Sequence, residues 1–252
     1  MSNIDEFVKY LKSEVKNNSI YVLGGQGESV MTSLTPKFLE AHESDSRIAQ
    51  IYQKLANDYA DKKDFSNAKI FDCSGLGVYY FLKNGYIKSD MTADGIYKIC
   101  TPIEYKDMRT GDFVFQYDGN TKKMHHIGYV IGIEDNHYQV IEAKGRAWGV
   151  VQSEFSQKNW THYGRPKFWN YSINRELIYE EGKPLMKGED VREVQTALTR
   201  KGYKPGTLDG EYGKNTAKAV AEFQEKETTV FKKNYGKVNK NTAIALGFNW
   251  KE

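Results

Sequence analysis

Phe71-Asp72-Cys73-Ser74-Gly75-Leu76 is the stretch that decides the fold, because an extended segment is expected to turn into a helix here, with a cysteine at the helix start. About 53 residues later, His126-Ile127-Gly128-Tyr129-Val130-Ile131-Gly132 places a histidine at the beginning of a strand-like run. The thiolate is the reactive form of cysteine, and both a helix N-terminus and a neighbouring imidazolium favour it. The two stretches therefore predict a cysteine nucleophile and its base, with the first helical N–H groups serving as an oxyanion hole.

The order of the expected elements indicates an α+β fold. Hydrophobic periodicity predicts a helix over residues 4–15, one or two helices over 38–59, and a buried helix over 73–82. Thr35, followed by Pro36, is expected to cap a helix, and Thr92 is expected to start another short one. From Gly111 onward the pattern changes to short strands, expected near 113–115, 127–133, 138–143 and 150–151. Helices first and an antiparallel meander second place helices against one sheet.

A second unit is expected after residue 182. Asp190 and Glu193 have the spacing of a capping box, and helices are predicted near 191–198, 216–223 and 241–246. We therefore predict a catalytic domain over residues 1–172, a linker over 173–182, and a small three-helix domain over 183–252.

Charge, cysteine count and hydropathy narrow the function classes. The formal charge of the 252 residues is +3, too small to indicate nucleic acid as a partner. Residues 183–252 hold about 14 basic and about nine acidic residues, which fits either an anionic partner surface or a solvated basic face. The chain has two cysteines, expected to be free thiols, and no window apolar enough for a membrane span. The first 18 residues lack the features of a signal peptide.

Four blocks of sequence resemble the NlpC/P60 peptidases. They are the Tyr21, Gly24 and Gly25 segment and the runs Asp72-Cys73-Ser74-Gly75-Leu76, Gly111-Asp112-Phe113-Val114-Phe115 and His126-Ile127-Gly128-Tyr129-Val130-Ile131-Gly132. The blocks cover residues 19–165 and have the order and spacing of that family. The resemblance implies a papain-like fold and a cysteine peptidase that cuts peptidoglycan stem peptides, commonly between D-glutamate and the diamino acid.

The C-terminal unit resembles a peptidoglycan-binding domain of the PG_binding_1 type. The matching residues are Gly188, Val191, Gln195, Leu198, Gly202, Tyr203, Gly206, Asp209, Gly210, Tyr212, Gly213, Thr216, Ala219, Val220, Phe223 and Gln224. Residues 225–238 depart from that pattern, which puts the third helix in doubt.

Two wall-directed domains without a signal peptide resemble a bacteriophage endolysin. The resemblance implies synthesis in the cytoplasm of the bacterial host and action on its cell wall, with holin-dependent access to bacterial peptidoglycan. No cofactor, nucleic acid or membrane insertion is expected. The alternatives are an N-acetylmuramoyl-L-alanine amidase that uses the same Cys-His pair, and a wall-binding protein without hydrolysis.

The catalytic roles follow from the motifs. Cys73 is expected to be the nucleophile, although a buried structural thiol is the alternative, and Cys100 is expected in the core. His126 is expected to be the general base, with His125 as its rival, since neighbouring strand residues point to opposite faces. The resemblance places the third catalytic residue at Glu142, which would orient the imidazole.

Several site assignments stay open at this point. His137 and Asn136 are the alternatives to Glu142, and the five histidines show no spacing typical of a metal site. The resemblance implies that Tyr21, Asp72 and Ser74 bind substrate, although Asp72 also suits a helix N-cap. Trp148, Trp160 and Trp169 could line the cleft or pack in the core. The long segment between Gly25 and Cys73 is expected to form one wall of the cleft and to narrow specificity.

Overall fold

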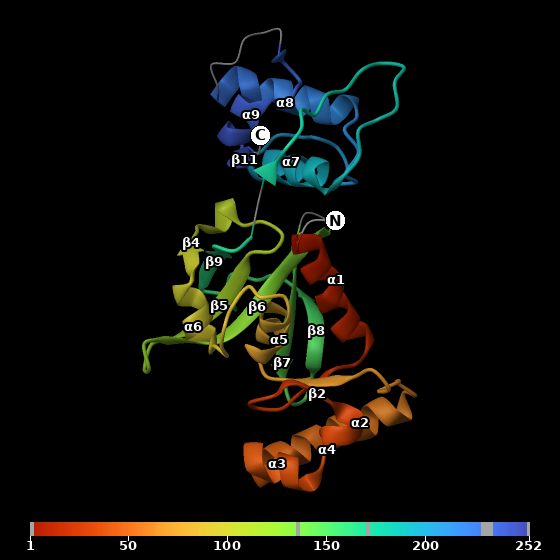
Figure 1. Cartoon of the computed structure of the whole chain (residues 1–252), viewed down its shortest axis with the longest axis vertical. Coiled ribbons are helices and arrows are strands. Elements are labelled where there is room, and N and C mark those ends of the chain that lie inside the picture. The colour runs from red at the N-terminus through yellow and green to blue at the C-terminus, as the bar shows by residue number, and fades with distance from the viewer. Residues whose placement is uncertain (1–2, 135–136, 170–171, 228–233, 251–252) are drawn as a thin grey trace. The chain divides into compact units, whose positions relative to one another are not determined.

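The computed structural model describes residues 3–134, 137–169, 172–227 and 234–250 (Figure 1). The chain divides into two compact units. The N-terminal unit, as we call it, comprises residues 4–103 and 110–168, and the C-terminal unit joins residues 104–109 to the stretch from residue 169 onward. The predicted boundaries at 172 and 183 stay predictions, but the segment predicted as a linker contributes the buried side chains of Ile173 and Leu177 to the C-terminal unit.

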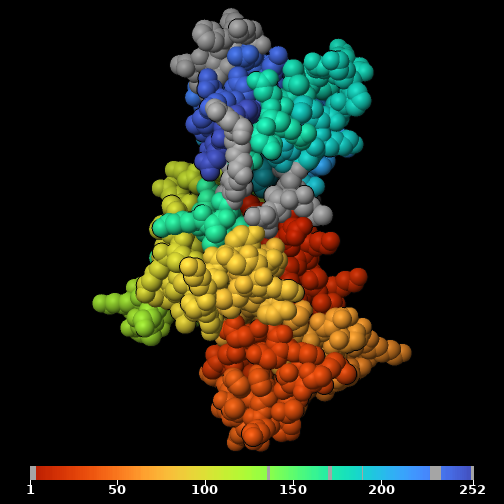
Figure 2. All heavy atoms as spheres, viewed as in Figure 1, coloured from red at the N-terminus to blue at the C-terminus, as the bar shows by residue number. Residues whose placement is uncertain are grey.

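A six-stranded antiparallel sheet forms the centre of the N-terminal unit, as the α+β prediction requires. Its strand order is β4-β9-β5-β6-β7-β8. The bounds are Cys100–Pro102 for β4, Phe113–Asp118 for β5, Lys123–Glu134 for β6, His137–Gly145 for β7, Gly149–Glu154 for β8 and His162–Pro166 for β9. The turn between β5 and β6 projects from the sheet, in yellow-green in Figures 1 and 2.

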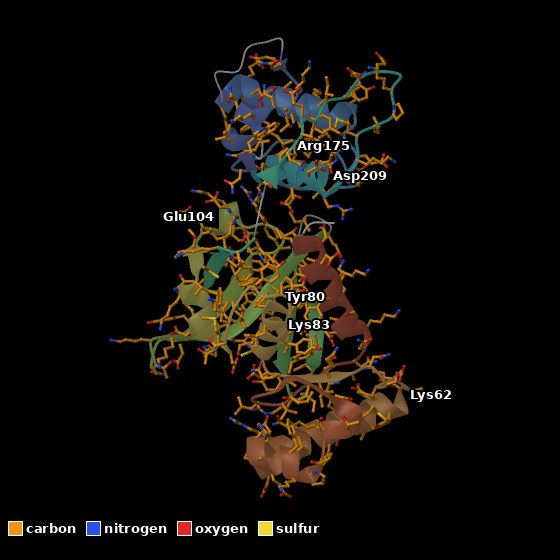
Figure 3. The ribbon with its side chains drawn as sticks, viewed as in Figure 1. Lys62, Tyr80, Lys83, Glu104, Arg175 and Asp209 are labelled. Carbon is orange, nitrogen blue, oxygen red and sulfur yellow. The ribbon has the colours of Figure 1, made fainter. Side chains whose placement is uncertain are left out.

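Two helices pack against one face of this sheet through aromatic side chains. They are α1 (Asn3–Lys16) and α5 (Gly75–Lys83), and Figure 3 labels Tyr80 and Lys83 on the second. The Phe7 ring lies 5.0 Å from that of Phe81 and 5.3 Å from that of Tyr129 on β6. A Cβ on Gly77 would overlap the Tyr129 hydroxyl, which accepts a hydrogen bond from the Gly77 amide at 3.1 Å. This glycine therefore lets α5 approach β6 closely, which brings the helix start next to the strand that carries His126.

Helix α6 (Ala93–Lys98) lies beside the sheet, and Thr92 caps it by accepting from the Gly95 amide, as the sequence predicts. Cys100 begins β4 and is buried, with its thiol 3.3 Å from the Ile96 carbonyl. Both cysteines are free thiols. The sequence patterns did not predict β4 or β9, since each is short and each ends at a proline.

A helical insertion packs on a second, three-stranded sheet with the order β1-β3-β2. Its strands are β1 (Ile20–Tyr21), β2 (Gln26–Ser29) and β3 (Lys69–Phe71), and its helices are α2 (Val30–Ser33), α3 (Pro36–His42) and α4 (Asp45–Ala60). Thr35 caps α3 by accepting from the Phe38 amide at 3.1 Å, as predicted. Figure 2 shows the insertion in orange-red. Its apolar core contains Ile20, Val22, Val30, Leu39, Ile51, Leu55, Phe65, Ala68 and Ile70.

Three helices make up most of the C-terminal unit: α7 (Glu189–Arg200), α8 (Lys214–Glu227) and α9 (Lys240–Ala245). A short parallel pair, β10 (Ser172–Ile173) and β11 (Asn249–Trp250), and the 3₁₀ helix η1 (Tyr105–Asp107) complete it. The capping-box prediction was wrong, because Gly188 occupies the N-cap position. The Asp190 carboxylate instead pairs with Arg175, labelled in Figure 3, at 2.7 Å.

Two buried glutamines hold the turns of this unit. The Gln195 side chain donates to Asp209 Oδ1 at 3.0 Å and accepts from the Gly210 amide at 2.9 Å. Gln224 repeats the arrangement, since it donates to the Lys237 carbonyl at 2.8 Å and accepts from the Gly236 amide at 2.9 Å. The third helix therefore forms although residues 225–238 depart from the expected pattern.

Within the described ranges, we find no helix with both the length and the apolar composition needed to cross a membrane.

Candidate functional site

Cys73 lies between the end of β3 and the first residue of α5, as the sequence predicts. Asp72 Oδ1 accepts from the Gly75 amide at 2.6 Å and from the Ser74 hydroxyl at 3.1 Å. Asp72 therefore acts as a capping residue for the first turn of α5. Its other oxygen accepts from the Gly24 amide at 3.1 Å, which joins the cysteine loop to the segment that follows β1.

Part of the predicted oxyanion hole is already occupied. The Gly75 amide donates to Asp72, and the Leu76 and Val78 amides donate to main-chain carbonyls. These helical N–H groups are therefore already satisfied and cannot donate to a substrate oxygen without losing a bond.

His126 lies on β6 with its ring close to Glu142 on β7. Nε2 of His126 is 2.7 Å from Glu142 Oε2, and both side chains are largely buried. Ser153 on β8 donates to the other oxygen of Glu142 at 3.3 Å. The His126 ring also stacks on that of Trp160, with centroids 5.5 Å apart and planes 13° apart. These contacts fix the plane of the imidazole ring.

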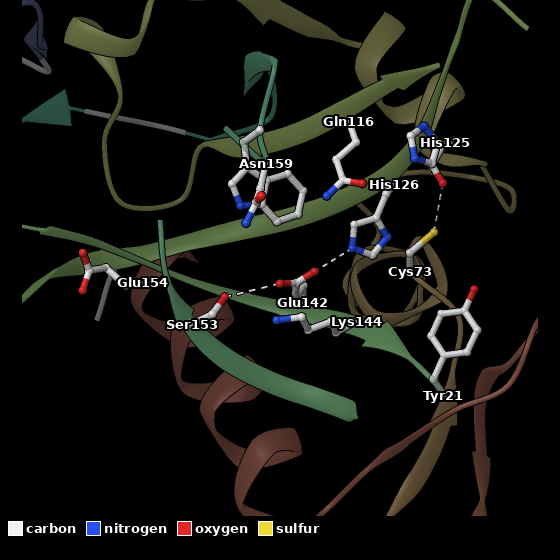
Figure 4. A pocket seen from close by; sticks show the side chains of 11 residues that line it. Tyr21, Cys73, Gln116, His125, His126, Glu142, Lys144, Ser153, Glu154 and Asn159 are labelled. Atoms are coloured by element: carbon white, nitrogen blue, oxygen red, sulfur yellow. Dashed lines mark hydrogen bonds and ion pairs between the residues drawn. The ribbon is translucent and has the colours of Figure 1, made fainter. Parts of the chain in front are cut away.

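The arrangement selects one tautomer of His126. A carboxylate can only accept hydrogen bonds, so Nε2 donates to Glu142 and carries the proton in the neutral ring. Figure 4 shows the other ring nitrogen, Nδ1, turned toward Cys73. A lone pair suited to accept a proton therefore faces the thiol.

The Cys73 thiol points elsewhere in this structure. Its Sγ lies 3.7 Å from the main-chain carbonyl oxygen of His125, as Figure 4 shows. Burial raises the pKa of the thiol to about 12 and the Asp72 carboxylate adds to the rise, while the main-chain amides of Ser74, Cys73 and Ile127 oppose it. The resting thiol is therefore protonated at neutral pH, and a rotation about the Cα–Cβ bond is needed to turn it toward His126.

A cavity of about 580 Å³ brings four of the six predicted site residues together, namely Tyr21, Cys73, His126 and Glu142. Asp72 and Ser74 do not line it, since both are used in the first turn of α5. Burial raises the pKa of Tyr21 to about 12; Cys73 adds to the rise and Arg146 opposes it. The Tyr21 hydroxyl therefore stays protonated at neutral pH and can donate a hydrogen bond.

The rival residues lie in other surroundings. His125 contributes its main-chain carbonyl to Cys73, and its exposed ring lines the cavity. His137 pairs with Glu154 at 2.9 Å on the surface. Asn136 lies outside the described residues. The carboxylate next to His126 is therefore that of Glu142, whereas its catalytic role stays a prediction.

Sequence reasoning missed several lining residues: Gln116, Lys144, Ser153, Glu154 and Asn159. Ser153 and Glu142 come from neighbouring strands, and only strand pairing brings them together. Of the tryptophans, Trp160 lines the cavity, Trp148 is exposed beside Lys144 and Trp169 is buried in the C-terminal unit. The prediction that the segment between Gly25 and Cys73 forms a wall of the cleft was wrong, because the described lining residues include none from it. Its effect on specificity stays a prediction.

Among the described residues, no group of three or more His, Cys, Asp or Glu side chains could hold a metal ion.

Two models of known protein families match this chain. The model of the NlpC/P60 family matches residues 19–165, more than half of the chain. The chain belongs to the NlpC/P60 family. A second model, described as a putative peptidoglycan binding domain, matches residues 187–228.

Individual relatives match over parts of this NlpC/P60 protein. A probable N-acetylmuramoyl-L-alanine amidase of Bacillus licheniformis is 42% identical over 90 residues, which is 33% of this chain and 25% of the relative. The chain thus spans about a quarter of the length of the curated relative that it matches.

Among solved structures, the similar chains include several from mycobacteria. The P60 domain of an antigen of M. avium subspecies paratuberculosis is 21% identical, covers 64% of this chain and 94% of its own, and has a TM-score of 0.40. The peptidoglycan hydrolase RipB of Mycobacterium tuberculosis is 19% identical over 65% and 66%, with a TM-score of 0.38. RipD of the same organism, described as a non-catalytic NlpC/p60 domain protein, is 14% identical over 64% and 98%, with a TM-score of 0.38.

Proposed function

We propose that this chain is a peptidoglycan hydrolase that cuts stem peptides through Cys73, His126 and Glu142. The observation that carries the proposal is the 2.7 Å contact between His126 Nε2 and Glu142, in the cavity that also exposes Cys73. With Nε2 hydrogen-bonded to Glu142, the free lone pair of the imidazole is on Nδ1, and this supports a role for His126 as the general base. The family membership supplies the substrate class, and the bond between D-glutamate and the diamino acid is the target that we propose.

The reaction follows from these positions. Rotation of Cys73 brings Sγ to Nδ1 of His126, which takes the thiol proton, and the Glu142 carboxylate stabilises the resulting imidazolium. The thiolate attacks the scissile carbonyl carbon and forms a C–S bond and an oxyanion. The oxyanion collapses, the C–N bond breaks and the leaving amine takes the proton from His126. Water, deprotonated by the same nitrogen, then hydrolyses the thioester and restores the thiol.

The oxyanion needs donors other than the occupied amides of α5. We propose the Tyr21 hydroxyl and the Cys73 main-chain N–H for this role. Tyr21 lines the cavity, and Figure 4 shows its hydroxyl pointing toward Cys73. The raised pKa of Tyr21 keeps that donor protonated over the range in which such an enzyme works.

The C-terminal unit is proposed to hold the enzyme on the wall. The peptidoglycan-binding model matches its first two helices, and residues 183–252 carry about five more basic than acidic side chains. An excess of basic side chains favours association with an anionic wall polymer. We propose further that the protein acts as an endolysin, made in the host cytoplasm and reaching the wall through a holin. Lysis of a producing cell only when a holin is co-expressed would support that setting.

A second candidate is amidase activity at the junction of sugar and peptide. The observation in its favour is the relative from Bacillus licheniformis, whose name is probable N-acetylmuramoyl-L-alanine amidase. The same Cys-His machinery can attack that amide, since the chemistry at the carbonyl is the same.

Mass spectrometry of the fragments released from purified peptidoglycan distinguishes the candidates. Wild-type protein should release fragments that end at D-glutamate, and Cys73→Ala should release none while still pelleting with the wall. Intact stem peptides freed from the sugar would assign the amidase reaction instead. No fragments from several wall types, with binding retained, would contradict hydrolysis and favour a binding role.

A further inference from the structure

A buried ion pair links the helical insertion to the wall of the cavity. Glu43, at the end of α3, has a fully buried side chain, and Arg146 lies in the turn between β7 and β8. Arg146 Nε donates to Glu43 Oε1 at 2.8 Å, and Arg146 Nη2 lies 2.8 Å from Glu43 Oε2. One hydrogen bond and a second close approach of unlike charges therefore join the guanidinium to the carboxylate, and together they restrict the position of both groups.

The same carboxylate also holds the segment after β1. Glu43 Oε1 accepts from the Leu23 amide at 2.8 Å. Leu23 is two residues beyond Tyr21, and the Gly24 amide is held from the other side by Asp72. The segment that carries Tyr21 is thus hydrogen-bonded to the insertion through the Leu23 amide and to the cysteine loop through the Gly24 amide.

Arg146 touches Tyr21 itself. Its guanidinium carbon lies 5.0 Å from the centre of the Tyr21 ring, within range of a cation–π interaction. Because Glu43 fixes the guanidinium, the guanidinium in turn fixes the plane of the ring. The ring lines the cavity, whereas Glu43 and Arg146 do not.

From these contacts we infer that Glu43 and Arg146 are positioning residues, which hold the Tyr21 hydroxyl at the site where the oxyanion develops. This inference rests on the proposed function. It gives the insertion a role in catalysis although no residue of its helices lines the cavity. It also explains a carboxylate buried on a segment remote from the chemistry, since burial of an ionised group is costly unless it is paired.

Amide hydrogen exchange tests the holding contact without any need for activity. In Glu43→Ala, the Leu23 amide loses its acceptor, so exchange in the segment 21–25 should rise by about tenfold or more while strands β6 and β7 keep their protection. A control is Asp112→Asn, which removes the charge from another buried ion pair, that with Arg165 (2.9 and 2.8 Å), in the same unit and away from the cavity. The control should leave exchange in 21–25 unchanged. Equal exchange in Glu43→Ala and wild type would overturn the inference.

A double-mutant cycle, with a soluble muropeptide as the substrate, tests whether Arg146 acts through Tyr21. Arg146→Met should lower kcat about tenfold with KM within about twofold, because an interaction made in the transition state is weakened. In a Tyr21→Phe background, which lacks the hydroxyl, the same change should lower kcat by less than about twofold. Arg146→Lys keeps a cation near the ring and should recover part of the loss. Equal losses in the two backgrounds would show that Arg146 acts by another route and would overturn the inference.

The two failures can be told apart. If wild type cleaves no muropeptide, the proposed function fails, and the exchange experiment still decides whether Glu43 holds the segment. If wild type cleaves and the cycle is additive, the proposed function stands and the inference fails. Melting temperatures of all variants show whether a loss of kcat reflects unfolding, since a purely structural role lowers activity equally with and without the Tyr21 hydroxyl.

Discussion

Two buried contacts of the N-terminal unit and two buried amides of the C-terminal unit differ in their chemistry. In the N-terminal unit the pairs of Glu142 with His126 and Glu43 with Arg146 are charged or can become charged. In the C-terminal unit the neutral amides of Gln195 and Gln224 hold the turns. A titratable pair can move a proton, but its contribution to stability depends on pH. The contribution of an amide to stability does not change with pH, so amides suit a unit that needs only to keep its folded structure.

The largest effect is expected when the histidine of the His126–Glu142 pair is removed. His126→Ala removes the proposed base, and kcat should fall by about 10² to 10⁴. The matched control is His125→Ala, which should lose less than tenfold, because the contact of His125 with Cys73 uses the main-chain carbonyl. Release of soluble fragments from purified wall measures both variants. Equal losses in the two variants would contradict the assignment of the base.

The next largest effect is expected for Gln224→Leu, which tests the neutral amide contacts of the C-terminal unit. The change removes donors to the Lys237 carbonyl and the Thr242 hydroxyl and the acceptor for the Gly236 amide, so the C-terminal unit should lose about 2–4 kcal/mol of unfolding free energy. Wall pelleting should weaken, whereas turnover of a soluble muropeptide should not change. Denaturant unfolding and pelleting measure the two quantities. A large fall in muropeptide turnover would show that the amide network also serves catalysis.

Glu142→Gln sharpens the comparison, since it replaces a charged partner by an amide of similar shape. The amide cannot stabilise the imidazolium as a carboxylate does, so kcat should fall by about tenfold to a hundredfold with little change in KM. Ser153→Ala, which removes only the outer hydrogen bond to Glu142, should cost less. Steady-state kinetics on a muropeptide gives both values. An unchanged kcat in Glu142→Gln would mean that the charge of Glu142 is not needed.

The smallest effect concerns acid stability. Burial alone would raise the pKa of Asp58, but hydrogen bonds from Lys54 and Lys63 lower it below the ordinary value. Because the folded-state pKa is depressed, these contacts stabilise the N-terminal unit above the unfolded pKa of about 3.9, and this stability is lost as the pH falls through the folded value. Asp58→Asn should lower Tm by about 2–4 °C at pH 7 and by less near pH 3. Thermal melts at the two pH values provide the measurement, and a loss that does not shrink at low pH would contradict this account.

Local signals predicted much of the fold. Thr35 and Thr92 cap their helices as their positions suggest, and the block around Cys73 falls at a strand-to-helix junction. The positions of Cys73 and His126 on these elements were predictable because each lies in a local pattern. The strands β4 and β9 were not predicted, since their pairing partners, and not their own few residues, make them strands.

Contacts between distant segments could not be predicted from such patterns. Glu43 and Arg146 are 103 positions apart, and no local sequence pattern around either residue indicates that they pair. Asp190 has the spacing of a capping box, but its carboxylate pairs with the guanidinium of Arg175. The Gly75 amide was expected among the oxyanion donors for the same lack of contact information. The structure shows that it already donates a hydrogen bond to Asp72.

The rate at which iodoacetamide alkylates Cys73 tests the central claim most directly, because it reports activation of the thiol without any substrate. Peptide mapping separates Cys73 from the buried Cys100. If His126 takes the thiol proton, wild type should be labelled at Cys73 at pH 7, and His126→Ala should be labelled about a hundredfold more slowly, with a rate that keeps rising with pH toward the raised pKa of the resting thiol. Equal rates at pH 7 in the two proteins would contradict the claim that His126 activates Cys73.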